Sequence, residues 1–258
     1  MDLKLKNKHI LVTGCSSGLA RGVAERLLNE GADVTGIARN IDKLNDLKDQ
    51  WPDQFTGIRA DLYKSGSEDE IFDLLSEKPL YGMLLNAGGP PVMQAKDTRP
   101  EHWDAAYHTV FRWKAALVLK FLPKMRKSKS GRIIFIESQS VKQPIPKLAL
   151  STSMRLAVTG FAKSLAGDLA ESGITVNVIA PGSHSTPAIE RVIEARAKDE
   201  GISKDEARNQ LEAGLPMKRM GTAEEIGALA GWLFSEHSSY ITGQTISHDG
   251  GNISHLFG

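Results

Sequence analysis

A chain of 258 residues, 41% of them hydrophobic, can bury one large core and suits a single α/β domain better than two small ones. Its 32 Lys and Arg residues nearly balance 31 Asp and Glu residues, so the formal net charge of +1 excludes a whole-molecule attraction to nucleic acid or an anionic membrane. One cysteine excludes a disulfide framework and a cysteine-based zinc site. The first residues lack the apolar run of a signal peptide, and no stretch reaches membrane-spanning length. We therefore expect a cytoplasmic protein with a small-molecule ligand.

Strand and helix patterns alternate along the whole chain. Apolar runs bounded by turn residues predict strands at residues 9–12, 33–37, 55–58, 81–85, 132–136, 174–179 and 244–247. Helical periodicity predicts helices at residues 18–29, 41–49, 68–76, 101–125, 150–171 and 222–234. Ser67 is the expected N-cap of the third of these helices. The alternation predicts an α/β fold with a single doubly wound parallel sheet and helices on both faces. Ligands of such sheets bind beyond the C-terminal ends of the strands, so we expect the loops after strands one, four, five and six to converge.

Residues 187–213 form the one segment that looks like an insertion. The segment is charged and helix-prone, and it lacks a strong apolar face. Its position after the sixth strand favours a flap over the ligand site. A pair of solvated surface helices would give the same pattern, so both interpretations stay open.

The end of the first strand has the features of an anion site. An apolar run ends in a small polar loop, and a helical pattern begins directly after it. Glycines let the backbone approach a phosphate, and the first free N–H groups of a helix point toward it. A plain strand-to-helix turn would give the same local pattern. The candidate cofactor-binding residues of this turn are Thr13, Gly14, Ser16, Ser17, Gly18 and Leu19.

The end of the second strand bears on the choice of cofactor. Dinucleotide-binding proteins often place an acidic residue there for the adenosine ribose, whereas a basic residue favours a 2′-phosphate. This chain has no acid at that point and offers Arg39. We therefore expect NADP(H) to be favoured over NAD(H), unless Arg39 is an ordinary surface charge.

Further motifs follow in order: Asp61-Leu62, Asn86-Ala87-Gly88, Pro181-Gly182 with Thr186, and two C-terminal runs at residues 219–226 and 240–251. Together with the first turn, they resemble the motifs of the short-chain dehydrogenase/reductase family over nearly the whole chain. The subgroup that comes closest resembles 3-oxoacyl carrier-protein reductases. The resemblance implies one Rossmann-fold domain over residues 1–258, and a homodimer or homotetramer formed through the two long helices.

The resemblance also implies which residues contact the cofactor. Asp61 and Leu62 would lie at the adenine ring, Asn86, Ala87 and Gly88 follow the fourth strand, and Pro181, Gly182 and Thr186 would lie at the nicotinamide carboxamide.

The catalytic residues of the family are largely replaced. The family uses Asn, Ser, Tyr and Lys, with Tyr and Lys four residues apart on one helix. Ser138 takes the place of the serine, but Ser151, Arg155 and Val110 take those of the tyrosine, lysine and asparagine. A tyrosine, with a pKa of about 10 that a cation lowers, can protonate the alkoxide left by hydride transfer. A serine is a far weaker acid, and arginine does not deprotonate in the working range. Arg155 can still bind the nicotinamide ribose, and Ser138 can donate to a substrate oxygen.

Three other residues are candidate proton donors. His184, in the loop after the sixth strand, has a suitable reference pKa of about 6.5 and is the first candidate. Lys142 would need a pKa lowered by burial, and Tyr107 lies one turn before Val110. The plain alternatives are a surface histidine, a solvated charge and a packing residue, respectively. No His, Asp or Glu set has metal-binding spacing.

These observations leave two main hypotheses. The first is an NAD(P)(H)-dependent oxidoreductase acting on a carbonyl or alcohol, similar to 3-oxoacyl reductases, in which Ser138 orients the substrate. The second is a non-catalytic dinucleotide-binding protein that acts as a sensor or a partner subunit. A cofactor-independent lyase is a more distant third.

Overall fold

The computed structural model of the protein describes residues 1–86 and 88–256. Its strands form one parallel sheet of order β3-β2-β1-β4-β5-β6-β7. The strand order reverses between β1 and β4, so the predicted doubly wound sheet is confirmed. The strands are β1 (His9–Thr13), β2 (Asp33–Ala38), β3 (Phe55–Arg59), β4 (Gly82–Asn86), β5 (Gly131–Ile136), β6 (Ile174–Pro181) and β7 (Thr245–His248).

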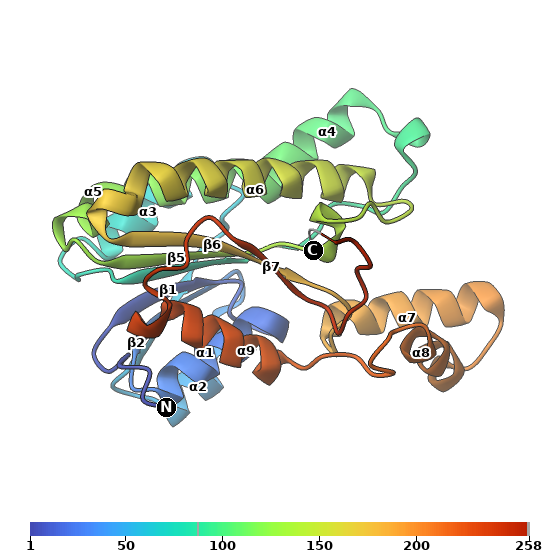
Figure 1. Ribbon diagram of the computed structural model, residues 1–258, viewed down its shortest axis with the longest axis horizontal. Coiled ribbons are helices and arrows are strands. Elements are labelled where there is room, and N and C mark those ends of the chain that lie inside the picture. The colour runs from blue at the N-terminus through green and yellow to red at the C-terminus, as the bar shows by residue number, and fades with distance from the viewer. Residues whose placement is uncertain (87, 257–258) are drawn as a thin grey trace.

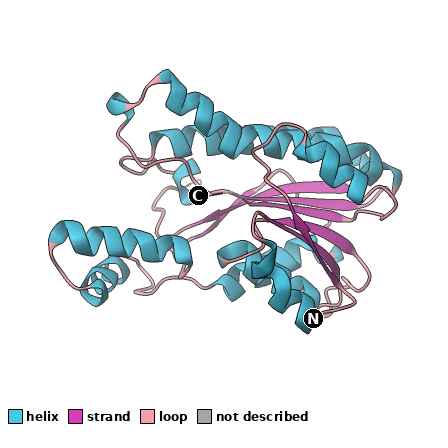
Figure 2. Ribbon diagram, turned by 180° about the vertical axis from the view of Figure 1, so that it is seen from behind, coloured by secondary structure: helices cyan, strands magenta, loops and turns pink. Residues whose placement is uncertain are grey.

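Helices cover both faces of this sheet, as Figure 1 and the reverse view in Figure 2 show. One face carries α1 (Gly18–Asn29), α2 (Asn45–Gln50) and α9 (Ala223–Phe234). The other carries α3 (Ser67–Leu74), α4 (Pro100–Ala106), α5 (Trp113–Lys127) and α6 (Ala149–Leu169). Across the described residues, none of the helices combines the length and the apolar character needed to span a bilayer.

The core consists of two apolar layers, one on each face of the sheet. Alternate strand residues point to opposite faces, so Ile10 and Val12 pack toward α1 and α9 while Leu11 packs toward α5 and α6. All three are fully buried. Burial of both faces explains why the strands appear in the sequence as continuous apolar runs.

Three predicted helices differ from the structure. The helix predicted at residues 41–49 begins with a 3-10 turn, Ile41–Leu44, and only α2 is α-helical. Ser67 is the first helical residue of α3, and the N-cap is Gly66, whose φ of 85° lies in the left-handed region that glycine tolerates. The helix expected at residues 101–125 is divided by a π-helical segment, Tyr107–Arg112, between α4 and α5. Val110 is buried in this segment, and such π-helical turns occur frequently at functional sites.

The segment after β6 forms two helices, α7 (Pro187–Glu200) and α8 (Lys204–Ala213). They pack on each other and are set off from the sheet in Figure 1. A narrow apolar stripe that the sequence analysis missed gives them a small core of their own, made of Ile193, Ala197, Ala207, Leu215 and Met220.

Candidate active site

Two glycines shape the turn after β1. Gly14 has a φ of 68° and Gly18 a φ of 62°, a conformation that is strained for residues with a Cβ. A Cβ at Gly14 would lie 3.2 Å from the side-chain nitrogen and the backbone oxygen of Asn86, and one at Gly18 would lie 3.5 Å from the methyl group of Thr186. The turn therefore brings the end of β4 and the loop after β6 against the start of α1, as the sheet topology predicts.

The side chains of the turn have different roles. The hydroxyl of Thr13 is buried; it donates to the backbone of β4 and accepts from Asn86 N at 2.8 Å, so it acts by fixing that strand. Ser17 is the exposed N-cap of α1, and its side chain makes no capping hydrogen bond. Leu19 packs against the core. Burial raises the pKa of the Cys15 thiol to about 12, so this residue is not a nucleophile.

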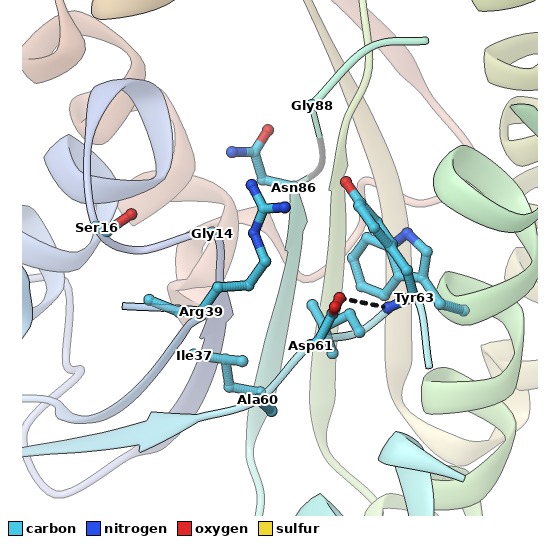
Figure 3. A pocket seen from close by; sticks show the side chains of 12 residues that line it. Gly14, Ser16, Ile37, Arg39, Ala60, Asp61, Tyr63, Asn86 and Gly88 are labelled. Atoms are coloured by element: carbon cyan, nitrogen blue, oxygen red, sulfur yellow. Dashed lines mark hydrogen bonds between the residues drawn. The ribbon is translucent and has the colours of Figure 1, made fainter. Parts of the chain in front are cut away.

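Four strand ends surround a cavity of about 130 Å³, drawn in Figure 3. Seven of the predicted cofactor residues line it: Gly14, Ser16, Arg39, Asp61, Leu62, Asn86 and Gly88. Five others do so as well: Ile37, Ala38, Ala60, Tyr63 and Trp113. The predicted contact Ala87 lies outside the described residues. The cavity fits one part of a dinucleotide better than a whole one, which is typical of a cleft that extends along several strand ends.

Tyr63 is a cavity residue that sequence reasoning missed. Its backbone N–H donates to Asp61 Oδ1 at 3.1 Å, and the Arg39 guanidinium carbon lies 5.9 Å from the centre of its ring. Its position directly after the Asp61-Leu62 motif was the available signal. A second cavity of about 430 Å³ continues past Arg39 and is also lined by Arg59 and Lys64.

Ser151 and Arg155 lie on one face of α6, as their four-residue spacing predicts. Arg155 Nε donates to Ser151 Oγ at 3.1 Å. Arg155 Nη1 donates to Glu137 at its backbone oxygen (3.2 Å) and at Oε2 (3.0 Å). Among residues 1–86 and 88–256, the contact of Arg155 Nη2 is a long one of 3.5 Å to the Gly88 oxygen. Within this part of the chain, the donors on Nη2 are therefore the ones that a ligand could use.

A buried charge cluster, formed by Lys114, Glu137 and Arg155, is the main feature that sequence reasoning missed. Lys114 Nζ donates to Glu137 Oε1, and neither side chain is exposed. Burial lowers the pKa of Lys114 to about 8, although attraction to Glu137 opposes this effect. The signal was a lysine in the apolar stripe of α5, next to Trp113 and one turn before Leu117.

Two serine hydroxyls accept hydrogen bonds and donate none among the residues that the structure describes. Ser138 Oγ accepts from the backbone N–H of Ser140 at 3.1 Å, and Ser151 Oγ accepts from Arg155. A hydroxyl that accepts through its oxygen still has its O–H to donate. Because Arg155 bonds both Ser151 and the carbonyl that precedes Ser138, the two hydroxyls belong to one site.

His184 is only 4% exposed, so the surface interpretation of this residue is wrong. Its Nδ1 lies 3.1 Å from the carbonyl oxygen of Gly182, which can only accept, so Nδ1 carries the proton there. Its Nε2 lies 2.9 Å from His248 Nδ1. Burial lowers the pKa of His184, and both ring nitrogens are used within the protein. These contacts argue against a role as proton donor.

The remaining predicted residues follow the loops. Gly182, after Pro181 at the end of β6, donates its N–H to His248 O at 3.0 Å, and Thr186 lies against Gly18. Tyr107 is 42% exposed and stacks on Phe111, which agrees with a packing role. Lys142 is half-buried at the end of the short turn that Ser138 caps. The described part of the chain has no group of three or more His, Cys, Asp or Glu residues that could hold a metal ion.

Comparisons with known proteins identify the family of this chain. The sequence model of a family described as enoyl-(acyl carrier protein) reductase matches residues 14–252. Dehydrogenase/reductase SDR family member 6 of Xenopus laevis is 33% identical and covers 96% of this chain and 98% of its own length. The NADPH-dependent reductase BacG of Bacillus subtilis is 30% identical, and the match covers 96% of this chain and 99% of BacG. The crystal structure of L-sorbose reductase from Gluconobacter frateurii in complex with NADPH and L-sorbose is similar, with 25% sequence identity and a TM-score of 0.94. The match covers 99% of this chain and 100% of the reductase. The chain therefore belongs to the short-chain dehydrogenase/reductase family.

Proposed function

We propose that the protein is an NADP(H)-dependent oxidoreductase that interconverts a carbonyl compound and its alcohol. The observation that carries this proposal is a pair of donor hydroxyls near the cofactor cavity: Ser151, which Arg155 bonds directly, and Ser138, which follows the Glu137 carbonyl that Arg155 also bonds. Relatives named as NADPH-dependent reductases support the same reaction class.

The residues present fit a dinucleotide. A Cβ at Gly14 would crowd the turn that approaches the pyrophosphate, and the free N–H groups at the start of α1 suit its charge. Asp61 and Leu62 would hold the adenine ring, and Asn86 and Gly88 would line the middle of the cleft. Pro181, Gly182 and Thr186 would face the carboxamide of the nicotinamide. Arg155 Nη2 would bind the nicotinamide ribose in place of the family's lysine.

A preference for NADP(H) over NAD(H) is supported by the charges around Arg39. The cavity next to its side chain is also lined by the cations Arg59 and Lys64 and by the carboxylates of Asp61 and Glu70, so its charged side chains have a net positive charge that suits a 2′-phosphate. Solved relatives of similar fold were crystallised with NADPH.

When bound, the reduced nicotinamide supplies a hydride to the carbonyl carbon. Ser138 and Ser151 would donate hydrogen bonds to the carbonyl oxygen, and Arg155 would polarise Ser151 and stabilise the negative charge that develops. Neither serine replaces tyrosine as an acid, because a serine hydroxyl is too weak. The alkoxide would therefore take its proton from solvent, and His184 would have no part in this step.

Elements around the site suggest which segment closes over the substrate and how the subunits associate. The helix pair α7 and α8, which begins after β6, would act as a flap over the substrate. The exposed Leu119 of α5 and Leu156 of α6 would bury their side chains in a homodimer or homotetramer.

Titration with NADPH, followed by an assay of NADPH consumption with a panel of carbonyl compounds, tests the proposal. We expect binding, and turnover that survives His184→Ala but is lost in Ser138→Ala. Arg155→Ala should weaken NADPH binding. Binding without turnover of any compound would favour the second hypothesis, a non-catalytic dinucleotide-binding protein. Absence of binding would contradict both.

A further inference from the structure

The buried charge cluster has one more positive than negative charge. Lys114 and Arg155 share the carboxylate of Glu137, one on each oxygen. The side chains of Lys114 and Glu137 are fully buried, and that of Arg155 is 9% exposed. Water screens such charges poorly, so the excess charge acts on its surroundings over several ångströms.

The cofactor cavity lies next to this excess charge. Arg155 Nη2 approaches the oxygen of Gly88, a residue that lines the cavity. A Cβ added to Gly89 would lie 3.9 Å from the same nitrogen. Lys114 Nζ lies 5.8 Å from the centre of the Trp113 ring, and Trp113 also lines the cavity. The cluster therefore lies behind two residues of the cavity wall, Gly88 and Trp113.

We propose that Lys114 determines which redox form of the cofactor the protein prefers: its charge, added to that of Arg155 across Glu137, disfavours the positively charged oxidised nicotinamide and so favours the reduced form. This inference rests on the proposed function, which places the nicotinamide ribose at Arg155. It assigns to Lys114 a specificity role through charge, without direct contact with the substrate.

The pKa of Lys114, lowered to about 8 by burial, makes this preference depend on pH. Glu137 at the end of β5 and Arg155 on α6 are the charged groups that face Lys114, whereas Lys120 and Asp69 pair at the surface between α5 and α3. As the pH rises through this pKa, Lys114 loses its proton and the cluster becomes neutral. Repulsion of the oxidised ring then falls. Reciprocally, oxidised cofactor should lower the pKa of Lys114 and release protons on binding.

Measurement of the dissociation constants of NADP⁺ and NADPH between about pH 6.5 and about pH 9.5 tests this inference without a known substrate. We expect the ratio of the two constants, oxidised over reduced, to fall about tenfold across this range, which corresponds to a shift of about one unit in the pKa of Lys114. The 2′-phosphate, with a pKa of about 6, titrates in both forms and cancels in the ratio.

Variants separate the charge of Lys114 from its packing. Lys114→Met should remove the pH dependence and lower the ratio at neutral pH, and Lys114→Arg should keep the ratio high at every pH. Lys120→Met, which removes a charge from an exposed pair on the same helix, should leave the ratio unchanged. Thermal unfolding shows whether each variant is folded, and the wild-type titration requires no variant.

A ratio that does not change with pH in the wild type would overturn the inference while leaving the proposed function standing. So would a Lys114→Met variant that behaves like the wild type. Absence of binding by both forms would overturn the proposed function, and this inference with it.

Discussion

The two halves of the candidate site are built in different ways. On the side of β1, β2 and β4, backbone conformation sets the shape: Gly14 and Gly18 have positive φ angles, and the Thr13 hydroxyl bonds the backbone of β4. On the side of β5, α5 and α6, the main feature is a set of buried charges, because Lys114 and Arg155 meet on one carboxylate.

This difference teaches how each half responds to substitution. A backbone-built site depends on a few positions, and its other side chains can vary. A buried set of charges is interdependent, because removal of one member leaves another charge without compensation. We therefore expect the larger effects of single changes in the charge cluster and smaller, local effects in the glycine turn.

The largest expected effect follows the loss of Glu137. Glu137→Ala leaves Lys114 and Arg155 as buried positive charges without a carboxylate, so the free energy of unfolding should fall by about 3–5 kcal/mol. Urea denaturation measures this loss. Glu194→Ala, which removes a carboxylate from an exposed pair with Lys204, should lower the free energy of unfolding far less, because water screens that pair. Equal losses in the two variants would contradict the comparison.

The charge cluster should also make the free energy of unfolding depend on pH. The pKa of Lys114 is about 8 in the folded protein and 10.5 as the ordinary value, so the unfolded state binds more protons between these values. The free energy of unfolding should therefore rise with pH in this window, by up to about 1.4 kcal/mol per pH unit. Denaturation at several pH values, in the wild type and in Lys114→Met, isolates this slope.

Lys120 provides a control of opposite sign. Its pairing with Asp69 raises the pKa of Lys120, so its stabilising contribution is lost as the pH rises through the folded value. Lys120→Met should abolish this decrease in the free energy of unfolding at high pH and keep the increase that is due to Lys114. If the difference in free energy of unfolding between the wild type and Lys114→Met did not change with pH, the buried lysine would not titrate as expected.

The same contrast explains how far the sequence predicted the fold. Local signals placed α1 correctly, because Gly18 and Gly31 mark its two ends, and the apolar runs predicted every strand of the described sheet. The cap of α3 was wrong because the preference of serine for N-caps gave way to the left-handed conformation available to Gly66.

The charge cluster could not be predicted because its contacts are distant in the chain. Lys114 and Glu137 are 23 residues apart, and Glu137 and Arg155 are 18 apart. A lone lysine in an apolar stripe normally extends its charge to water, so only the tertiary partner shows that it is buried. The burial of His184 could not be predicted for the same reason, since its partner His248 lies 64 residues away.

Gly14→Ala tests the backbone-built half. The new Cβ would lie 3.2 Å from Asn86 in a left-handed conformation, so we expect a loss of about 2 kcal/mol in stability and weaker NADPH binding. Gly160→Ala is the matched control: it lies inside α6 with no heavy atom near the new Cβ, and it should stabilise the helix by up to about 1 kcal/mol. Unchanged stability and binding in Gly14→Ala would show that the turn is not fixed by backbone conformation.

Arg39 tests the contrast between the two halves of the site. It lies in the half shaped by backbone conformation, yet its side-chain charge is proposed to determine cofactor selectivity. If Arg39 binds the 2′-phosphate, Arg39→Asp should shift the ratio of NADPH to NADH dissociation constants by about tenfold, equal to about 1.4 kcal/mol, and leave NADH binding nearly intact. Arg59→Asp, which changes a residue of the neighbouring cavity alone, should give a smaller shift in the same direction. If the glycine turn binds the part that both cofactors share, a change that weakened NADPH and NADH equally would assign Arg39 to the turn's structure. Selectivity would then depend on Arg59 and Lys64. If Arg59→Asp also left the ratio of the NADPH and NADH dissociation constants unchanged, the preference for NADP(H) could not be explained by these charges.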